Sequence, residues 1–427
     1  MTGNTRMYIR LGILCAFIGI GAYLVRTSDS VPALTWMYIY KPSDFVHASA
    51  ASIVLFFANL RIPIPPMIAL LEILSIKTQG SAMLVTRYGY RTALVGSYAA
   101  AIWLAGTSIK RTAAAFLASV VFLYATIKIH PGNPQNYDIF FPMFFLIYLG
   151  LLQRVSKTRR DTAKQAVLLP ALAGFFLSMA ELSRPFAIYL LPLLVAGAYF
   201  ALTRASGKKS FVAFLVPILL ISGVWHSYLL AAHHQLTFSN NAGFNVARAW
   251  PQIPRVPLGP ETHDAFAPGR WPNLNTEQHS VNSNLTQQLQ LRYWLTHPLG
   301  SLLYTVDRVI VLLEVHTRTY RYAPESRWFG LYTLLARSLS GVTILSAIIS
   351  IVMMAIHPRR IPAMLANPDN MIVLFTVCCM VFLAAGEVSE EARLLLTILP
   401  CLATIAIYRS AGNEPGDRSM REPGASW

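Results

Sequence analysis

The sequence contains few charged residues and very few acidic ones. Charged side chains make up 13% of its 427 residues, and Asp and Glu together number only 19. A soluble domain carries roughly 25% charged residues, whereas 55% of this chain is hydrophobic. These values exclude an ordinary soluble protein and predict an all-α, polytopic membrane protein.

Cysteine is also scarce, and its four positions all lie in apolar segments: Cys15, Cys378, Cys379 and Cys401. That placement excludes a disulfide framework and a cysteine zinc site. The scattered histidines do not have metal-ligand spacing either, so neither residue type predicts a metal site. An internal repeat and a nucleotide-binding loop are also absent from the sequence.

Long apolar segments predict roughly 11 to 13 transmembrane helices by the length that a bilayer requires. Two of the segments, 46–60 and 64–84, are the least regular because prolines interrupt them. The sequence leaves open whether these two segments cross the membrane or lie in its interface. The candidate spans are Leu11–Val25, Val46–Leu60, Ile64–Leu84, Thr92–Gly106, Thr112–Ile129, Tyr137–Leu152, Ala166–Met179, Pro185–Leu202, Phe211–Ala231, Tyr332–Ile356, Met371–Ala385 and Leu394–Tyr408.

The net charge of +16 comes from basic residues in short segments between the spans. This pattern is the positive-inside signature, and it argues against a nucleic-acid partner. The basic groups around residues 154–164, 204–209, 359–360 and 409–421 all fall on the side of the N-terminus. Both termini are therefore expected in the cytoplasm, with a bacterial inner membrane as the location. Arg87 and Arg91 do not fit this count.

The opposite, extracytoplasmic face receives every connection whose residues could come together for catalysis or binding. We divide the chain into an N-terminal transmembrane module (1–232), a long extracytoplasmic loop (233–298), an interfacial helix with C-terminal transmembrane helices (299–410), and a cytoplasmic tail (411–427). Residues 299–315 have a helical apolar pattern with three charges, which predicts a helix lying in the membrane interface.

Several motifs together resemble the GT-C membrane glycosyltransferases, which include the aminoarabinose and lipid A core transferases and the protein mannosyltransferases. The resemblance covers most of the chain through the order of the motifs, and no single motif is specific. They are Ser43-Asp44-Phe45-Val46-His47-Ala48 followed by Pro65-Pro66; Tyr137-Asp138; Glu181-Leu182-Ser183-Arg184-Pro185; Tyr293-Trp294-Leu295-Thr296-His297-Pro298; and Glu390-Glu391-Ala392-Arg393 followed by Pro400.

The resemblance implies an enzyme that moves a sugar from a polyprenyl-phosphate donor to a glycan, lipid or protein acceptor, with inversion. Asp44 is the candidate general base, and its alternative role is to cap the helix that follows it. Asp138 would orient the acceptor, ligate a divalent cation or pair near the base; alternatively it is a helix N-terminal charge. Many family members carry a second acid where this chain has Phe45, so a divalent cation is the cofactor left open.

Arg184 and Arg393 are the candidates for binding the donor phosphate, because a guanidinium fits phosphate oxygens. The alternative is that each pairs with a nearby acid, Arg184 with Glu181 and Arg393 with Glu390. The other candidates for binding substrate or phosphate are Lys41, His130, Arg248, Trp250 and Glu390. The alternative for Lys41, His130, Arg248 and Trp250, which the sequence favours, is a solvated loop residue.

Two other functions remain open from the sequence. An O-antigen-type polymerase or ligase would depend on Arg248, Arg255, Arg270 and His263. A lipid or solute transporter would use charges within spans, for which Glu72 and Lys77 are the only candidates.

Overall fold

The structure, a computed structural model, describes residues 3–27, 47–49, 51–52, 82–104, 109–129, 139–157, 165–184, 187–233, 277–318, 327–386 and 398–405. Within these ranges all regular secondary structure is helical, which confirms the predicted helical class. The helices of the first half are α1 (Gly3–Thr27), α4 (Ala82–Leu104), α5 (Ile109–Ile129), α6 (Phe140–Lys157), α7 (Gln165–Glu181), α8 (Ala187–Ser206), α9 (Lys208–Ile218), the π-helical segment η4 (Leu219–Gly223) and α10 (Val224–His233). The second half contains α12 (Glu277–Thr296), α13 (Pro298–Arg318), α14 (Arg327–Ile356), the 3-10 turn η8 (Pro358–Arg360), α15 (Ile361–Leu365), α16 (Pro368–Gly386) and α18 (Leu399–Ile405).

Five helical stretches in the described part are long and apolar enough to cross a membrane: Thr5–Leu24, Ile109–Ile127, Ala187–Ser206, Lys208–Ala231 and Gly330–Ile356. A pair of helical segments, 358–365 and 368–381, passes the same test together but bends by 93° between them. Two more apolar helices, 140–155 and 167–181, are shorter. The length and composition of these helices indicate a membrane-embedded protein.

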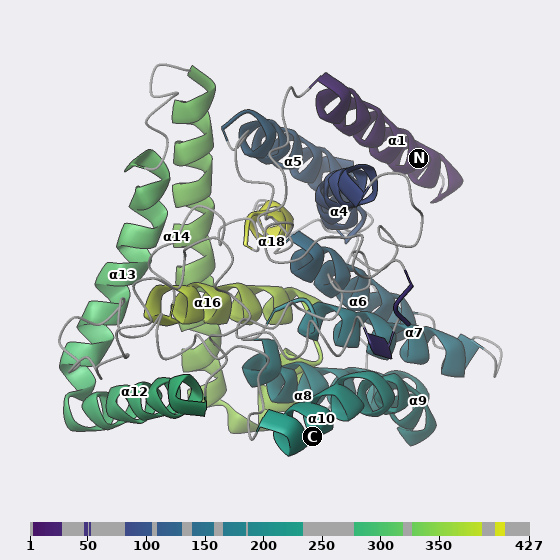
Figure 1. The fold of residues 1–427 in the computed structure, drawn as a ribbon. Helices are drawn as coiled ribbons and strands as arrows, with labels where there is room; N and C mark the ends of the chain where they lie inside the picture. The colour runs from purple at the N-terminus through teal and green to yellow at the C-terminus, as the bar shows by residue number, and fades with distance from the viewer. Residues whose placement is uncertain are drawn as a thin grey trace.

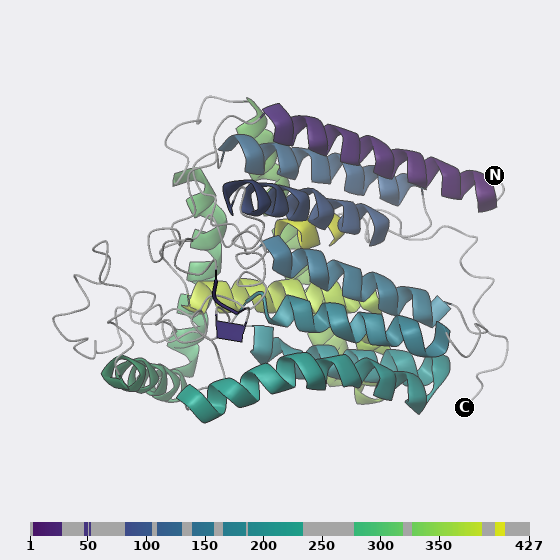
Figure 2. The ribbon, with the colours of Figure 1, turned by 45° about the vertical axis from the view of Figure 1, so that its right-hand side comes forward.

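In the first half of the chain, α1 and α4 to α8 run in alternating directions and form a row, and α9, η4 and α10 continue it as one stretch (Figures 1 and 2). Arg10 Nη2, near the start of α1, donates a hydrogen bond of 3.1 Å to the carbonyl oxygen of Trp103, near the end of α4. We call this end of the row, where α1 starts and α4 ends, the proximal end, and the opposite end the distal end. Short connections then carry α5 and α7 toward the distal end and α6 and α8 back, so α7 ends and α10 ends at the distal end (Figure 2).

Helix α13 runs crosswise to this row at the distal end in both views (Figures 1 and 2). It packs against α12, α14 and α16. Its outer side exposes Leu299, Leu302 and Leu303, whereas Ser301 and Val309 are buried. The predicted helix is thus present, with one side buried and one exposed, and its location in the membrane interface stays a prediction.

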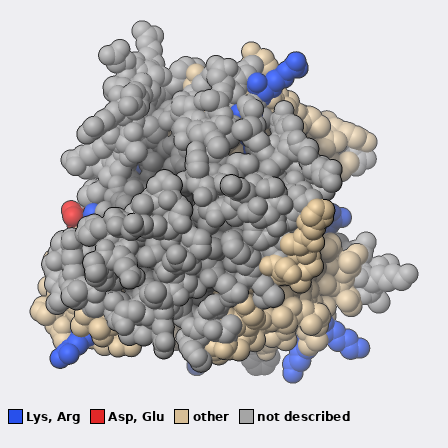
Figure 3. Space-filling model, viewed as in Figure 1, with Lys and Arg blue, Asp and Glu red and all other residues tan. Residues whose placement is uncertain are grey.

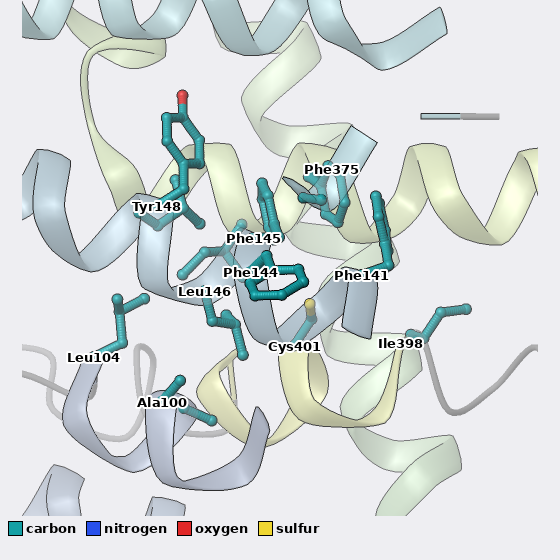
Figure 4. Packing of buried hydrophobic residues seen from close by; sticks show 14 of the residues in the cluster. Ala100, Leu104, Phe141, Phe144, Phe145, Leu146, Tyr148, Phe375, Ile398 and Cys401 are labelled. Atoms are coloured by element: carbon teal, nitrogen blue, oxygen red, sulfur yellow. The ribbon is translucent and has the colours of Figure 1, made fainter. Parts of the chain in front are cut away.

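Aromatic rings from α6 and α16 form the centre of the core (Figure 4). Residues four apart on a helix share a face, and Phe141 and Phe145 of α6 use this spacing to meet Phe375 of α16. The ring centroids of Phe145 and Phe375 lie 3.6 Å apart and those of Phe141 and Phe375 lie 5.3 Å apart, both stacked. One turn further, the hydroxyl of buried Tyr148 donates to the carbonyl oxygen of Leu194 in α8 at 3.0 Å. The core therefore joins α6, α8 and α16.

Charged side chains of the described residues lie around the rim of the face drawn in Figure 3, where acidic side chains are visible at one place on the left. Most of the described helical surface is apolar instead, including Leu219 and Leu220 of η4 and Leu334 of α14. Exposed apolar helical surface of this kind fits a helix bundle surrounded by lipid.

Two sequence predictions need correction. Ala82–Leu84 was expected to end one span and residue 92 to begin the next, but α4 is continuous from Ala82. Arg87 and Arg91 thus lie inside a helix rather than in a loop. Residues 277–296, expected within a long irregular loop, form α12; their Gln, Leu and Arg residues favour helix, while their polarity gives no apolar signal.

Candidate functional site

Only three Asp, Glu, Lys, Arg or His side chains are buried in the described part of the chain, and they occur together. Glu181 is 1% exposed, Arg184 is 2% exposed and His226 is 7% exposed. Removing charged groups from water without partners costs several kcal/mol per ion, on the order of 5. A cluster of this kind is therefore either a structural network or a site at which the charges bind a ligand or take part in catalysis.

The end of α7 and a tight turn position Glu181 and Arg184. Helix α7 ends at Glu181, and the backbone then folds through bonds between residues three apart: Ser183 N–H to Ala180 O, Arg184 N–H to Glu181 O and Ala187 N–H to Arg184 O, each 3.1 Å long. The last of these bonds leads directly into α8. Arg184 consequently lies at the junction of the two helices, as the Arg-Pro motif predicts.

Glu181 occupies an unfavourable place for a carboxylate. It lies at the C-terminal end of a helix, where the unsatisfied carbonyl groups disfavour negative charge by about 0.3–1 kcal/mol. His226 of α10 compensates: its Nε2 lies 2.6 Å from Glu181 Oε1. When the carboxyl group is ionised it only accepts hydrogen bonds, and Nε2–H of His226 is then the donor.

The second oxygen of the same carboxyl group, Glu181 Oε2, is buried and makes no hydrogen bond to the described residues. A buried acceptor with no donor is rare in native structures and calls for an explanation. Three elements thus contribute to this group of charges: α7, the turn after it and α10.

Close approach of α7 and α9 makes the Glu181–His226 contact possible. A Cβ atom at Gly174 of α7 would collide with the backbone carbonyl oxygen of Phe214 of α9. Small residues at helix interfaces allow such contact between membrane helices. One helical turn further along α7, Ser178 is fully buried, and its hydroxyl donates a hydrogen bond of 3.0 Å to the carbonyl oxygen of Gly174. Glu181 lies on the turn after that.

Of the residues predicted to form the site, Arg184 is the one that the structure describes. The structure places its expected ion-pair partner, Glu181, against His226. The other predicted residues lie outside the described ranges: Lys41, Asp44, His130, Asp138, Arg248, Trp250, Glu390 and Arg393.

Two described contacts bear on the neighbourhoods of Asp44 and Asp138. Ser49 Oγ accepts a 3.0 Å hydrogen bond from the backbone N–H of Ser52, which is the N-cap pattern. Asp44 itself lies outside the described residues, so both of its predicted roles stay predictions. Next to Asp138, buried Ser97 of α4 donates to Ile139 O at 3.0 Å and so ties the beginning of α6 to α4.

The sequence analysis missed His226. Its partner is 45 positions away in the sequence, and a histidine in an apolar segment has no local signal of function. Within the described residues no group of three or more His, Cys, Asp or Glu side chains is placed to hold a metal ion.

Comparisons of the chain with protein-family models, with curated proteins and with solved structures found no match. The site must accordingly be interpreted from its own chemistry.

Proposed function

We propose that the chain is a membrane glycosyltransferase that moves a sugar from a polyprenyl-phosphate donor to a glycan, lipid or protein acceptor. The observation that carries the proposal is the burial of Arg184 beside Glu181 and His226 at the distal end of an apolar helix bundle. A guanidinium buried at the end of a bundle is suited to an anionic group that arrives within the membrane, such as the phosphate of a lipid.

The position of the basic clusters at one end of the row supports an extracytoplasmic site at the other end. The end of α6 at Lys157 and the α8–α9 junction with Arg204, Lys208 and Lys209 both lie at the proximal end of the row (Figure 2). Positive residues favour the cytoplasmic side. The distal end, with Arg184 and the crosswise helix α13, then faces the exterior.

In the proposed reaction, Asp44 removes the proton from an acceptor hydroxyl. The acceptor oxygen forms a bond to the anomeric carbon on the face opposite the phosphate, which gives inversion. The bond from that carbon to the phosphate oxygen breaks, and polyprenyl phosphate leaves with the electron pair. Arg184, aided by Arg393, stabilises the negative charge that develops on the leaving phosphate.

The experiment is a turnover assay of the purified protein with undecaprenyl-phosphate-linked sugars, following release of undecaprenyl phosphate. Asp44→Asn should abolish release while the protein still inserts and purifies normally, and Arg184→Gln should strongly reduce release. Arg204→Gln is the matched control, because Arg204 is an exposed arginine at the other end of α8. Full activity of Asp44→Asn would overturn its role as base, and release that fails with every such donor would overturn the proposed function.

The same assay separates this proposal from a polysaccharide polymerase or ligase. Such an enzyme would depend on the basic residues of the segment between α10 and α12. Loss of product formation in Arg248→Ala, with activity retained in Asp44→Asn, would favour that alternative.

A further inference from the structure

The helix that carries His226 is interrupted by the π-helical segment η4 (Leu219–Gly223), which joins α9 to α10 without a break in the chain. Pro217, just before it, has no backbone N–H and so removes one of the normal helical bonds. A π-segment holds one residue more than an α-helix of the same length and often occurs at functional sites. Ser222 is the buried residue of this segment, and η4 packs against α7.

The pattern of burial shows what the extra residue does. Ser210, Phe214, Ile218, Ser222 and His226 are all buried, and each follows the previous one by four positions. In a regular α-helix each residue turns by about 100°, so Ser210 and His226 would point about 160° apart, on nearly opposite faces. The additional residue in the π-segment removes about 100° of this difference. Ser222 and His226 are thereby kept on the side that packs on α7.

Ser222 lies level with Glu181 along this pair of helices. Helix α7 and the stretch from α9 to α10 run in the same direction, toward the distal end (Figure 2). They touch at Gly174 and Phe214, and an α-helix rises by about 1.5 Å per residue. An equal advance along both helices from that contact reaches Glu181 on α7 and, once the additional π-residue is counted, Ser222 on η4. His226, one turn further, reaches back to Glu181 because helical side chains tilt toward the N-terminus of their helix.

Two buried polar atoms at this level make no hydrogen bond to the described residues. They are Glu181 Oε2 and Ser222 Oγ, and the two residues are each 1% exposed. The other carboxyl oxygen, Glu181 Oε1, lies 2.6 Å from His226 Nε2, so the carboxyl group cannot turn Oε2 elsewhere without losing that contact. Buried polar groups in native proteins are paired with the protein or with ordered water, and an unpaired one is costly.

The group that pairs with these two atoms must be small and must be able to donate a hydrogen bond. A carboxylate oxygen only accepts, whereas a serine hydroxyl both donates and accepts. A lipid chain offers no donor, and a sugar or a lipid headgroup is too large for atoms that are closed off from the surface. Serine is also the small buried side chain between Ile218 and His226 on this face, which leaves space beside the carboxyl group. Water meets these conditions, since a buried water makes about three hydrogen bonds to such groups.

We propose that one buried water molecule bridges Glu181 Oε2 and Ser222 Oγ, between α7 and the π-segment. The water completes the hydrogen bonding of a carboxyl group at the C-terminal end of a helix, where His226 supplies the other half. It also joins α7 to η4, so the turn into α8 starts from a fixed helix end. The inference is independent of the proposed function, because it involves no substrate.

The direct test is a density map of the unaltered protein in nanodiscs, at a resolution that shows ordered water. The expected result is a single peak within about 2.7–3.2 Å of both Glu181 Oε2 and Ser222 Oγ. A direct hydrogen bond between the two side chains, or no peak between them, would overturn the proposal. A larger continuous feature would overturn it as well, because another ligand would then occupy the site.

A pair of serine variants tests the same site in solution. Ser222→Ala should lower the thermal unfolding midpoint by about 2–4 °C, because Glu181 Oε2 loses the water that Ser222 helps to hold. Ser340→Ala is the matched control: Ser340 is fully buried and its Oγ also makes no hydrogen bond to the described residues, but its helix, α14, carries none of the buried charged side chains. Removing that hydroxyl should leave the midpoint unchanged or raise it. A midpoint in Ser222→Ala that falls no further than in Ser340→Ala contradicts the bridge.

Coupling between the two residues provides a second measurement. Glu181→Met replaces the carboxyl group by an apolar side chain of similar length, so the bridge is already lost in that variant. Adding Ser222→Ala to it should then lower the midpoint no further, whereas independent residues would give additive losses. Additive losses would overturn the bridge. If Glu181→Met does not fold, the density map and the comparison of Ser222→Ala with Ser340→Ala still decide the matter.

Discussion

The α-carbon of Gly174 in α7 faces the backbone carbonyl oxygen of Phe214 in α9 so closely that no Cβ atom fits between them. This contact sets the distance between two helices whose distal ends bring Glu181 and His226 together. A change at Gly174 should therefore act at the site without altering any charged residue.

We expect Gly174→Ala to destabilise the protein by about 1–3 kcal/mol, as overpacking of a close contact does, and to weaken donor binding because α9 must move. The measurement is the thermal unfolding midpoint in detergent together with undecaprenyl phosphate binding. Gly341→Ala in α14 is the matched control: a Cβ there meets nothing within 4 Å, and Ala favours helix over Gly. Equal unfolding midpoints and equal binding in the two variants would show that the close approach at Gly174 does not hold α7 and α9 in place.

Phe145 should be among the most sensitive core positions. Its side chain is fully buried and its ring stacks on Phe375, so Phe145→Ala removes a large contact between α6 and α16. A loss of about 3–5 kcal/mol is expected, seen as a lower unfolding midpoint. Phe175→Ala of α7, where the side chain is 39% exposed, should cost clearly less; a reversed order would show that the aromatic cluster does not organise the core.

The junction of α8 and α9 depends on one glycine. Gly207 has φ 85° and ψ 178°, a conformation that is essentially confined to glycine. Gly207→Ala should cost about 1–3 kcal/mol and increase trypsin cleavage at the adjacent Lys208 and Lys209. Gly12→Ala in α1, where a Cβ meets nothing within 4 Å, should leave both stability and cleavage unchanged. Resistance of the Gly207 variant to trypsin, with an unaltered midpoint, would refute the strain argument.

Arg184→Lys separates charge from geometry in the proposed reaction. Lysine keeps the positive charge but loses the planar fork that binds two phosphate oxygens. We expect kcat/KM for the lipid-linked sugar to fall roughly 100-fold, in the range seen when one donor to a developing negative charge is lost. Steady-state kinetics in detergent would measure this, with Arg204→Lys as the control. Wild-type kinetics in the Arg184 variant would remove this residue from the proposed site.

The sequence predicts those parts of the fold that depend on local apolar composition. The segment 112–129 corresponds to α5 at Ile109–Ile129, and 332–356 corresponds to α14 at Arg327–Ile356. Continuous hydrophobic runs define these helices, so their ends are found within a few residues. Helix α12 was missed because a polar surface helix carries no such run.

For the candidate site, the sequence identified Arg184 from a local motif but not the partner of Glu181. The contact of His226 with Glu181 depends on the additional residue in η4 and on the close approach at Gly174. Neither feature follows from the hydrophobic pattern of the sequence, and the approach at Gly174 joins two different helices. Hydrophobic periodicity assumes a regular helix, and a regular helix would turn His226 away from α7.

The single non-helical residue between α8 and α9 has a consequence for how the protein is made. Gly207 alone separates Ser206 from Lys208, so α8 and α9 form a tight helical hairpin with Lys208 and Lys209 at its tip. We expect such a hairpin to insert into a membrane as one unit. Because α9 continues through η4 into α10, His226 belongs to the same unit as the helix that follows Arg184.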